Sequence, residues 1–242
     1  MKNHLNTIIL AVAGLLVAFV LTSAYKNRSR QDDIISVKGL GSQDFTSDLI
    51  VWEADFSSFG YSLKSANAEL DSNRALIRNY LIGKGINPKE IVFSAVDIDK
   101  VFNNWYDDDK NYHSEFKGYK LAQSINIESR EVEKIEQLSR EVTELLSQGI
   151  EINSGAPKYY YTKLAELKIE MVAAATEDAR IRAEQIAKNS SASLGHLRFA
   201  QMGVFQITGQ NSSDDYSWGG SFNTSSKNKT ASITMKLQFG VD

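Results

Sequence analysis

The chain has 242 residues, of which 42% are hydrophobic, and its formal net charge at pH 7 is −3. This mildly acidic balance argues against nucleic acid as a partner, because phosphate binding requires clustered lysine and arginine. The chain has no cysteine, which excludes disulfides, thiolate zinc sites and cysteine nucleophiles.

The chain begins with Met1 and Lys2, and residues 5–25 carry no charge. A secretory signal has a basic start and a short apolar core, whereas a spanning helix needs roughly 20 apolar residues, and this segment satisfies both patterns. We therefore expect a hydrophobic N-terminal helix in residues 1–25, acting as a signal peptide cleaved after Ala24 or as an uncleaved membrane anchor.

Residues 26–33 are polar and charged, and they are predicted to be a tether between the leader and the domain. The tether contains Lys26, Arg28 and Arg30, so the positive-inside bias leaves open a third orientation, in which the domain stays in the cytoplasm. We expect the domain to be exported and to lie in the cell envelope, facing the periplasm.

Residues 34–242 are predicted to form one α+β domain. Alternating polarity predicts strands at 34–38, 49–59, 91–102, 118–127, 150–152 and 159–161. Helical spacing predicts helices at 63–81 and, after a Ser129 cap, at 130–145. Gly39-Leu40-Gly41 is predicted to be a turn and residues 103–115 a polar loop. Strand, helix, strand, strand, helix, strand is the split βαβ order of a ferredoxin-like core with a mostly antiparallel sheet.

A long third helix is predicted from Lys163 to near Asn189, and its small side chains favour close packing. The expected inner stripe is Ala165, Ile169, Val172, Thr176, Ala179, Ala183 and Ile186. A C-terminal β-hairpin of residues 194–208 and 231–241 should follow, joined by a polar loop, 209–230. Three aromatic residues stand out in this loop as candidate contacts with a partner or ligand: Tyr216, Trp218 and Phe222.

No constellation of catalytic, cofactor-binding or metal-binding residues stands out, so no such site is predicted. The three histidines, His4, His113 and His196, do not share ligand spacing. The acidic run Asp107 to Asp109 lacks the glycine and glutamate of a calcium loop and is interpreted as a solvated loop. An enzyme that uses carboxylates alone remains an alternative; its candidate residues are Asp48, Asp97, Asp99 and Asp178.

Six segments occur in a recognisable order along the chain: Ile35 to Gly41 followed by Asp48, Gly85 to Ile91, Gly118-Tyr119, Ala173 to Ala175 with Asp178-Ala179, Arg182 to Glu184, and Leu194-Gly195. In this order they resemble the SIMPL-domain family of bacterial envelope proteins. Ser47 stands where the family often has proline. The resemblance implies an exported α+β domain that tends to self-assemble, an association with envelope or oxidative stress tolerance, and no established enzymatic activity.

We therefore expect a non-enzymatic, self-assembling envelope protein that forms homo-oligomers, without cofactor, and that contacts the membrane through residues 5–25 if these are uncleaved. The alternative is a periplasmic module that binds a small ligand or protein partner with the 209–230 loop.

Overall fold

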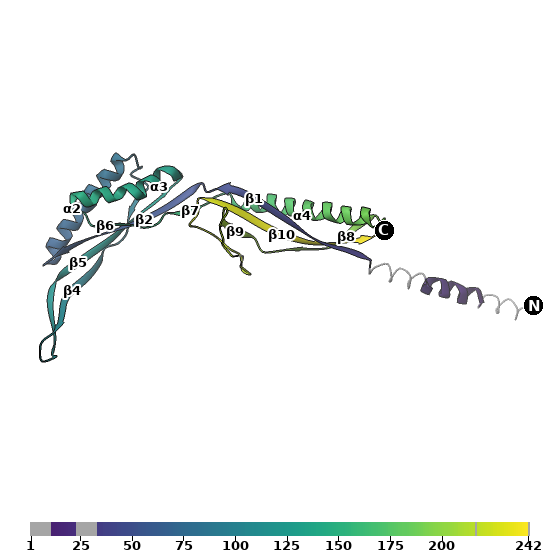
Figure 1. Ribbon diagram of the computed structural model, residues 1–242, viewed down its shortest axis with the longest axis horizontal. Coiled ribbons are helices and arrows are strands. Elements are labelled where there is room, and N and C mark those ends of the chain that lie inside the picture. The colour runs from purple at the N-terminus through teal and green to yellow at the C-terminus, as the bar shows by residue number, and fades with distance from the viewer. Residues whose placement is uncertain (1–10, 23–32, 216, 242) are drawn as a thin grey trace, which may run out of the picture.

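The computed structural model describes residues 11–22, 33–215 and 217–241. Residues 11–22 are helical, and the rest forms an elongated molecule in which each of two sheets has helices on one face (Figure 1). No helix within the described residues is long and apolar enough to cross a membrane. Residues 1–10 and 23–32 lie outside the described ranges, so the expected signal peptide or anchor and its tether stay predictions.

Residues 49–160, here called the head lobe, confirm the predicted split βαβ order. β2 and β5 pair at the centre, β3 lies beside β5, β6 lies beside β2, and every pair is antiparallel. The strands are β2 (Leu49–Gly60), β3 (Ile91–Phe93), β4 (Asp97–Tyr106), β5 (Tyr112–Ser129), β6 (Ile152–Ser154) and β7 (Lys158–Tyr160).

One face of the head sheet is covered by α2 (Leu63–Gly83) and by α3 (Val132–Glu141), which continues as the 3-10 helix η1 (Val142–Gln148). The predicted inner faces of these helices are buried, except that Leu63 is 44% exposed. Ser129 does not cap α3 as predicted, because it is the last residue of β5 and its hydroxyl accepts a hydrogen bond from the Glu131 N–H.

Residues 34–46 and 161–241, here called the terminal lobe, form the second sheet and its helix. Its elements are β1 (Ile34–Thr46), α4 (Leu164–Asn189), β8 (Leu194–Met202), β9 (Gln206–Gly209) and β10 (Asn228–Val241). β8 and β9 both pair antiparallel with β10, which confirms the C-terminal hairpin. The other edge of β10 pairs with β1, so the first and last strands of the domain lie side by side.

The predicted inner stripe of the third helix is confirmed at Ala179 and Ala183, which are buried, and Val172 is half-buried against the core. The prediction is wrong at Ile169, which is 73% exposed, and at the exposed Ala165 and Ile186. The buried residues of α4 are Leu167, Met171, Ala175, Ala179, Ala183 and Ala187. They recur every four residues, so the buried stripe turns by about 40° at each step around a helix of 3.6 residues per turn. A rotating stripe fits the twist of the β1 and β10 strands on which α4 lies.

Gly39-Leu40-Gly41 is not a turn, since β1 runs through it without a break. The two glycines lie where β1 meets α4. A Cβ on Gly39 would overlap the carbonyl oxygen of Ala175 and lie 2.7 Å from the Ala179 Cβ. Glycine is needed here because any side chain would separate the strand from the helix.

The predicted polar loop 103–115 is instead most of a two-stranded hairpin, and the predicted strand 91–102 is divided into β3 and β4. The pairing of β2 with β5 ends at Tyr119, but β4 and β5 stay paired out to Tyr106 and Tyr112. Residues 102–117, here called the arm, thus project from the head lobe (Figure 1). A count of polar residues misses this strand pair because aromatic residues are interleaved among them.

Candidate functional site

The predicted contact residues belong to the segment between β9 and β10. Trp218 is 99% exposed and Phe222 is 51% exposed, whereas Tyr216 lies outside the described residues. Phe222 forms an isolated bridge with Ile207 of β9, so its backbone is tied to the sheet. The structure therefore places Phe222 against the domain and leaves Trp218 in solvent.

Gln206, a buried residue of β9, holds this loop in place. Its Oε1 accepts hydrogen bonds from the Ser221 N–H at 2.7 Å and from the Ser217 N–H at 3.3 Å. Its Nε2 donates to the Ser217 carbonyl at 2.8 Å. A buried amide that satisfies three backbone groups fixes the loop conformation, because leaving any of them unpaired would be costly.

Two ionisable side chains fix the end of the loop nearest β10. Lys229 is 2% exposed, and its Nζ donates to the carbonyls of Tyr159 and Asn223, each at 2.6 Å. Burial lowers the pKa of Lys229 to about 8. Asp214 accepts hydrogen bonds from the Gly209 N–H at 2.9 Å and from the Asn223 amide at 2.8 Å, and these hold its pKa below the ordinary value.

A cavity of about 290 Å³ lies beneath the loop. It is lined by Leu164, Lys168, Val204, Phe205, Ile207, Gly219, Gly220, Ser221 and Phe222. Lys168 is the one ionisable side chain among them, and its Nζ lies 5.3 Å from the centre of the Phe205 ring. Apolar walls with a single cation suit a small anion with an apolar body.

The same region joins the two lobes. Lys227 precedes β10, and its Nζ lies 2.8 Å from Glu136 Oε2 on α3. This pairing lowers the pKa of Glu136 and raises that of Lys227. Between β1 and β2, Asp48 accepts hydrogen bonds from the N–H and hydroxyl of Thr162, at 2.7 and 2.6 Å. The loop end is therefore part of the connection between the lobes.

The candidate carboxylates do not converge. Asp178 of α4 accepts a hydrogen bond from the Leu40 N–H at 2.9 Å and another from Arg182 at 2.9 Å, which lower its pKa. Asp48 is bound to Thr162, and Asp97 and Asp99 lie on β4 of the head lobe. Asp48 and Asp178, two residues on which the family resemblance rests, thus hold elements of the fold together.

The remaining sequence candidates lie apart from the loop. His113 Nε2 is 2.7 Å from Asp107 Oδ2, a contact that lowers the pKa of Asp107, and the His113 ring stacks on Trp105 at 5.3 Å. His196 is exposed on β8. In the part of the chain that the structure describes, no three acidic or histidine side chains are grouped so that they could hold a metal ion.

Sequence reasoning missed the aromatic arm. Phe102 packs against Phe116 with ring centres 5.7 Å apart, and Tyr106 packs against Tyr112 at 5.5 Å. The available signal was two short aromatic stretches flanking the turn at residues 107–111. Sequence reasoning also missed Lys229, because it assigned this residue to the polar loop 209–230, whereas β10 begins at Asn228.

Comparison with known proteins identifies the family of the chain. A search of curated proteins found none similar to this chain. Residues 35–239 match the SIMPL family, described as a protein of unknown function (DUF541), and this range covers both lobes. The chain belongs to the SIMPL family.

Proposed function

We propose that this SIMPL-family chain is an exported, non-enzymatic protein of the cell envelope that assembles into homo-oligomers. It faces the periplasm, anchored in the inner membrane by its leader or released by cleavage, and contributes to envelope or oxidative stress tolerance. The uncharged residues 5–25 support export. The structural roles of Asp48 and Asp178 support a non-enzymatic protein, because these carboxylates are already engaged.

The observation that carries the proposal is the exposed edge of β1. β1 has 13 residues, and β10 is its one partner among the described strands. Such an edge presents backbone N–H and C=O groups that can pair with another chain. On this edge the Leu40 N–H already donates a hydrogen bond to Asp178. The backbone N–H and C=O groups before and after Leu40 on the same edge could pair with a second copy. β8 offers another edge across the sheet.

The first experiment measures the mass of the full chain in detergent micelles by size-exclusion chromatography with light scattering. We expect an oligomer at micromolar concentration, and a strict monomer would contradict self-assembly. The Ser42→Pro variant removes one edge N–H, because residues 40 and 42 point the same way along a strand. It should reduce the oligomer, whereas Ser42→Ala, which keeps the N–H, should not.

Trp218 tests whether the aromatic loop takes part. Because Trp218 is 99% exposed, Trp218→Ser removes a contact surface at little cost to the fold. We expect weaker assembly than for Tyr61→Ser, a control at a residue that is 83% exposed in the head lobe. Equal behaviour of the two variants would exclude the loop from the interface.

Cell fractionation with N-terminal sequencing tests the location. Recovery in the membrane or periplasmic fraction, with the leader intact or cut after Ala24, is expected. Recovery in the cytosol with an intact leader would refute the export proposal.

The cavity beneath the loop supports a second candidate, a module that binds a small anionic ligand. We expect 1-anilinonaphthalene-8-sulfonate, an aromatic anion, to bind there with increased fluorescence. Lys168→Ala should weaken binding, whereas Lys163→Ala, at an exposed lysine outside the cavity lining, should not. Equal binding by both variants would exclude the cavity.

A further inference from the structure

The arm exposes several large aromatic side chains. Phe102, Trp105, Tyr106, Tyr112 and Phe116 are between 42% and 70% exposed. Its strands reach about 17 Å beyond the head sheet, at about 3.4 Å for each of five residues. A two-stranded hairpin is marginally stable by itself, and large exposed aromatic groups mark interaction sites.

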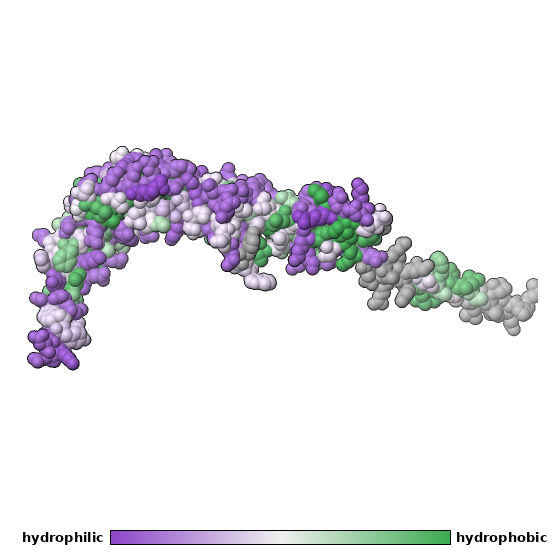
Figure 2. Space-filling view, in the orientation of Figure 1, coloured by the Kyte–Doolittle hydropathy of each residue, from purple (hydrophilic) through white to green (hydrophobic). Residues whose placement is uncertain are grey.

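The tip of the arm is also acidic. The arm carries four carboxylates, Asp107, Asp108, Asp109 and Glu115, against two lysines, Lys110 and Lys117, and three of the four carboxylates stand together at its turn. Asp108 and Asp109 are exposed. Figure 2 shows the hydrophilic tip beyond a stretch in which hydrophobic side chains are visible. The arm therefore offers aromatic rings followed by negative charge.

The terminal lobe has the opposite character on the sheet face that points away from α4, here called the docking face. Lys38 and Lys236 are directly opposite each other on β1 and β10. The Arg198 side chain covers Gly240 on this same face, because a Cβ on Gly240 would project to the docking face and lie 2.7 Å from Arg198 Nε. Like charges at directly opposed positions destabilise a sheet, and none of the three cations forms an ion pair with a carboxylate among the described residues.

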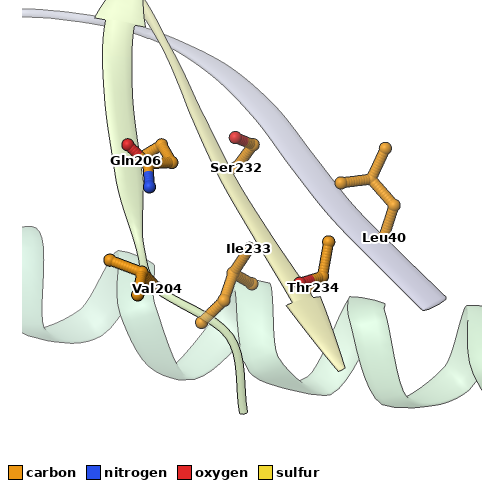
Figure 3. A pocket seen from close by; sticks show the side chains of 6 residues that line it. All are labelled: Leu40, Val204, Gln206, Ser232, Ile233 and Thr234. Atoms are coloured by element: carbon orange, nitrogen blue, oxygen red, sulfur yellow. The ribbon is translucent and has the colours of Figure 1, made fainter. Parts of the chain in front are cut away.

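Apolar side chains accompany these cations. Phe199, opposite Gln238 on the docking face, is 43% exposed, and Leu40 is 51% exposed. A groove of about 390 Å³ adjoins Leu40 where β8 ends and β9 begins. Figure 3 shows its six lining side chains, from β1, β10 and the β9 region. Its volume falls within the range of ligand pockets, about 300–1,000 Å³.

We propose that the arm of one copy docks on the docking face of a second copy, with aromatic rings against Leu40, Phe199 and the groove, and the acidic tip against Lys38, Lys236 and Arg198. This inference rests on the proposed self-assembly and adds a second contact to the one proposed at the β1 edge. The arm and the docking face lie at opposite ends of the elongated molecule (Figure 1), so the contact joins different copies. The contact is head to tail, and repeating it produces a ring or a filament.

The lack of native cysteine allows a direct test by crosslinking of the full chain in micelles. Asp108→Cys and Lys236→Cys are purified separately, mixed, and treated with a short bifunctional maleimide. We expect a crosslinked dimer in the mixture and much less with either variant alone. Lys64→Cys on the exposed face of α2 replaces Lys236→Cys as the control, and equal crosslinking to it would overturn the proposal.

Exchanging the charges on the two surfaces provides a second test. Asp108→Lys/Asp109→Lys and Lys38→Glu/Lys236→Glu should each raise the dissociation constant at least tenfold, and mixing the two should restore assembly. Glu69→Lys/Glu170→Lys, with the same charge change at exposed sites elsewhere, should have little effect. Normal assembly of the exchange variants would refute this docking but leave self-assembly standing, whereas a monomeric wild-type chain would refute both.

Discussion

Replacement of Gly39 by alanine tests the close approach of β1 and α4. The added methyl group would overlap the Ala175 carbonyl oxygen and lie 2.7 Å from the Ala179 Cβ, whereas carbon atoms pack at about 3.5–4.0 Å. The helix would have to move away by about 1 Å, because the obstacle includes its backbone and no rotamer change relieves it. Overpacking of a core costs about 1–3 kcal/mol, and we expect Gly39→Ala near the upper value.

For a chain of this length that unfolds as one unit, a loss of about 3 kcal/mol lowers the Tm by roughly 6–12 °C. Thermal unfolding followed by circular dichroism measures it. Gly83→Ala is the matched control, since a Cβ there meets no atom within 4 Å and the residue ends a helix. It should be neutral or stabilising by up to about 1 kcal/mol. A Tm for Gly39→Ala within about 1 °C of wild type would refute the packing argument.

Three further predictions concern the fold. Ala183→Leu should cost roughly 1–3 kcal/mol in urea unfolding, whereas Ile169→Ala, at a residue that is 73% exposed, should cost under about 0.5 kcal/mol. Burial lowers the pKa of Lys229 from 10.5 to about 8, so the folded state binds fewer protons in that interval and stability should rise with pH across it. Lys229→Met should remove this rise, and an unchanged pH profile would contradict the burial of a titrating lysine. Because Lys227 holds the pKa of Glu136 below 4.5, Glu136→Gln should cost up to about 1 kcal/mol near neutral pH. This difference should vanish as the pH falls well below 4.5, and its persistence in acid would show that the loss is not electrostatic.

The head lobe could be predicted from the sequence because its strands and helices occur consecutively along the chain in the order of a known motif. Ile77 and Leu81, for example, repeat at helical spacing and are both fully buried. The terminal lobe depends on contacts between distant segments. A Gly-x-Gly pattern in a sequence is compatible with a turn and equally with a strand packed closely against a helix. At Gly39 the two can be told apart only when the position of α4 is known. The buried residues of α4 likewise recur every four positions because the helix lies on the twisted strands β1 and β10, which are distant from it in the sequence.

The candidate site was predicted in part for the same reason. Phe222 was found as an aromatic residue in a polar loop, and it lines the cavity. Gln206 and Lys229 were missed because their roles depend on carbonyls and amides supplied by other segments. A buried polar side chain has no periodic signature in a sequence, since its partners are set by the tertiary structure.

The pairing of β1 with β10 has a consequence for biosynthesis. Thr46 and Asn228, which lie at the start of that ladder, are 182 positions apart in the chain. At the usual elongation rate of about 5–20 residues per second, β1 is made roughly 10 to 40 s before its partner. Until α4 is made, the inner face of β1, with Gly39 and Gly41, has no helix to receive it. The nascent chain therefore stays open along this edge, and the strand is exposed to premature pairing with a neighbouring polypeptide.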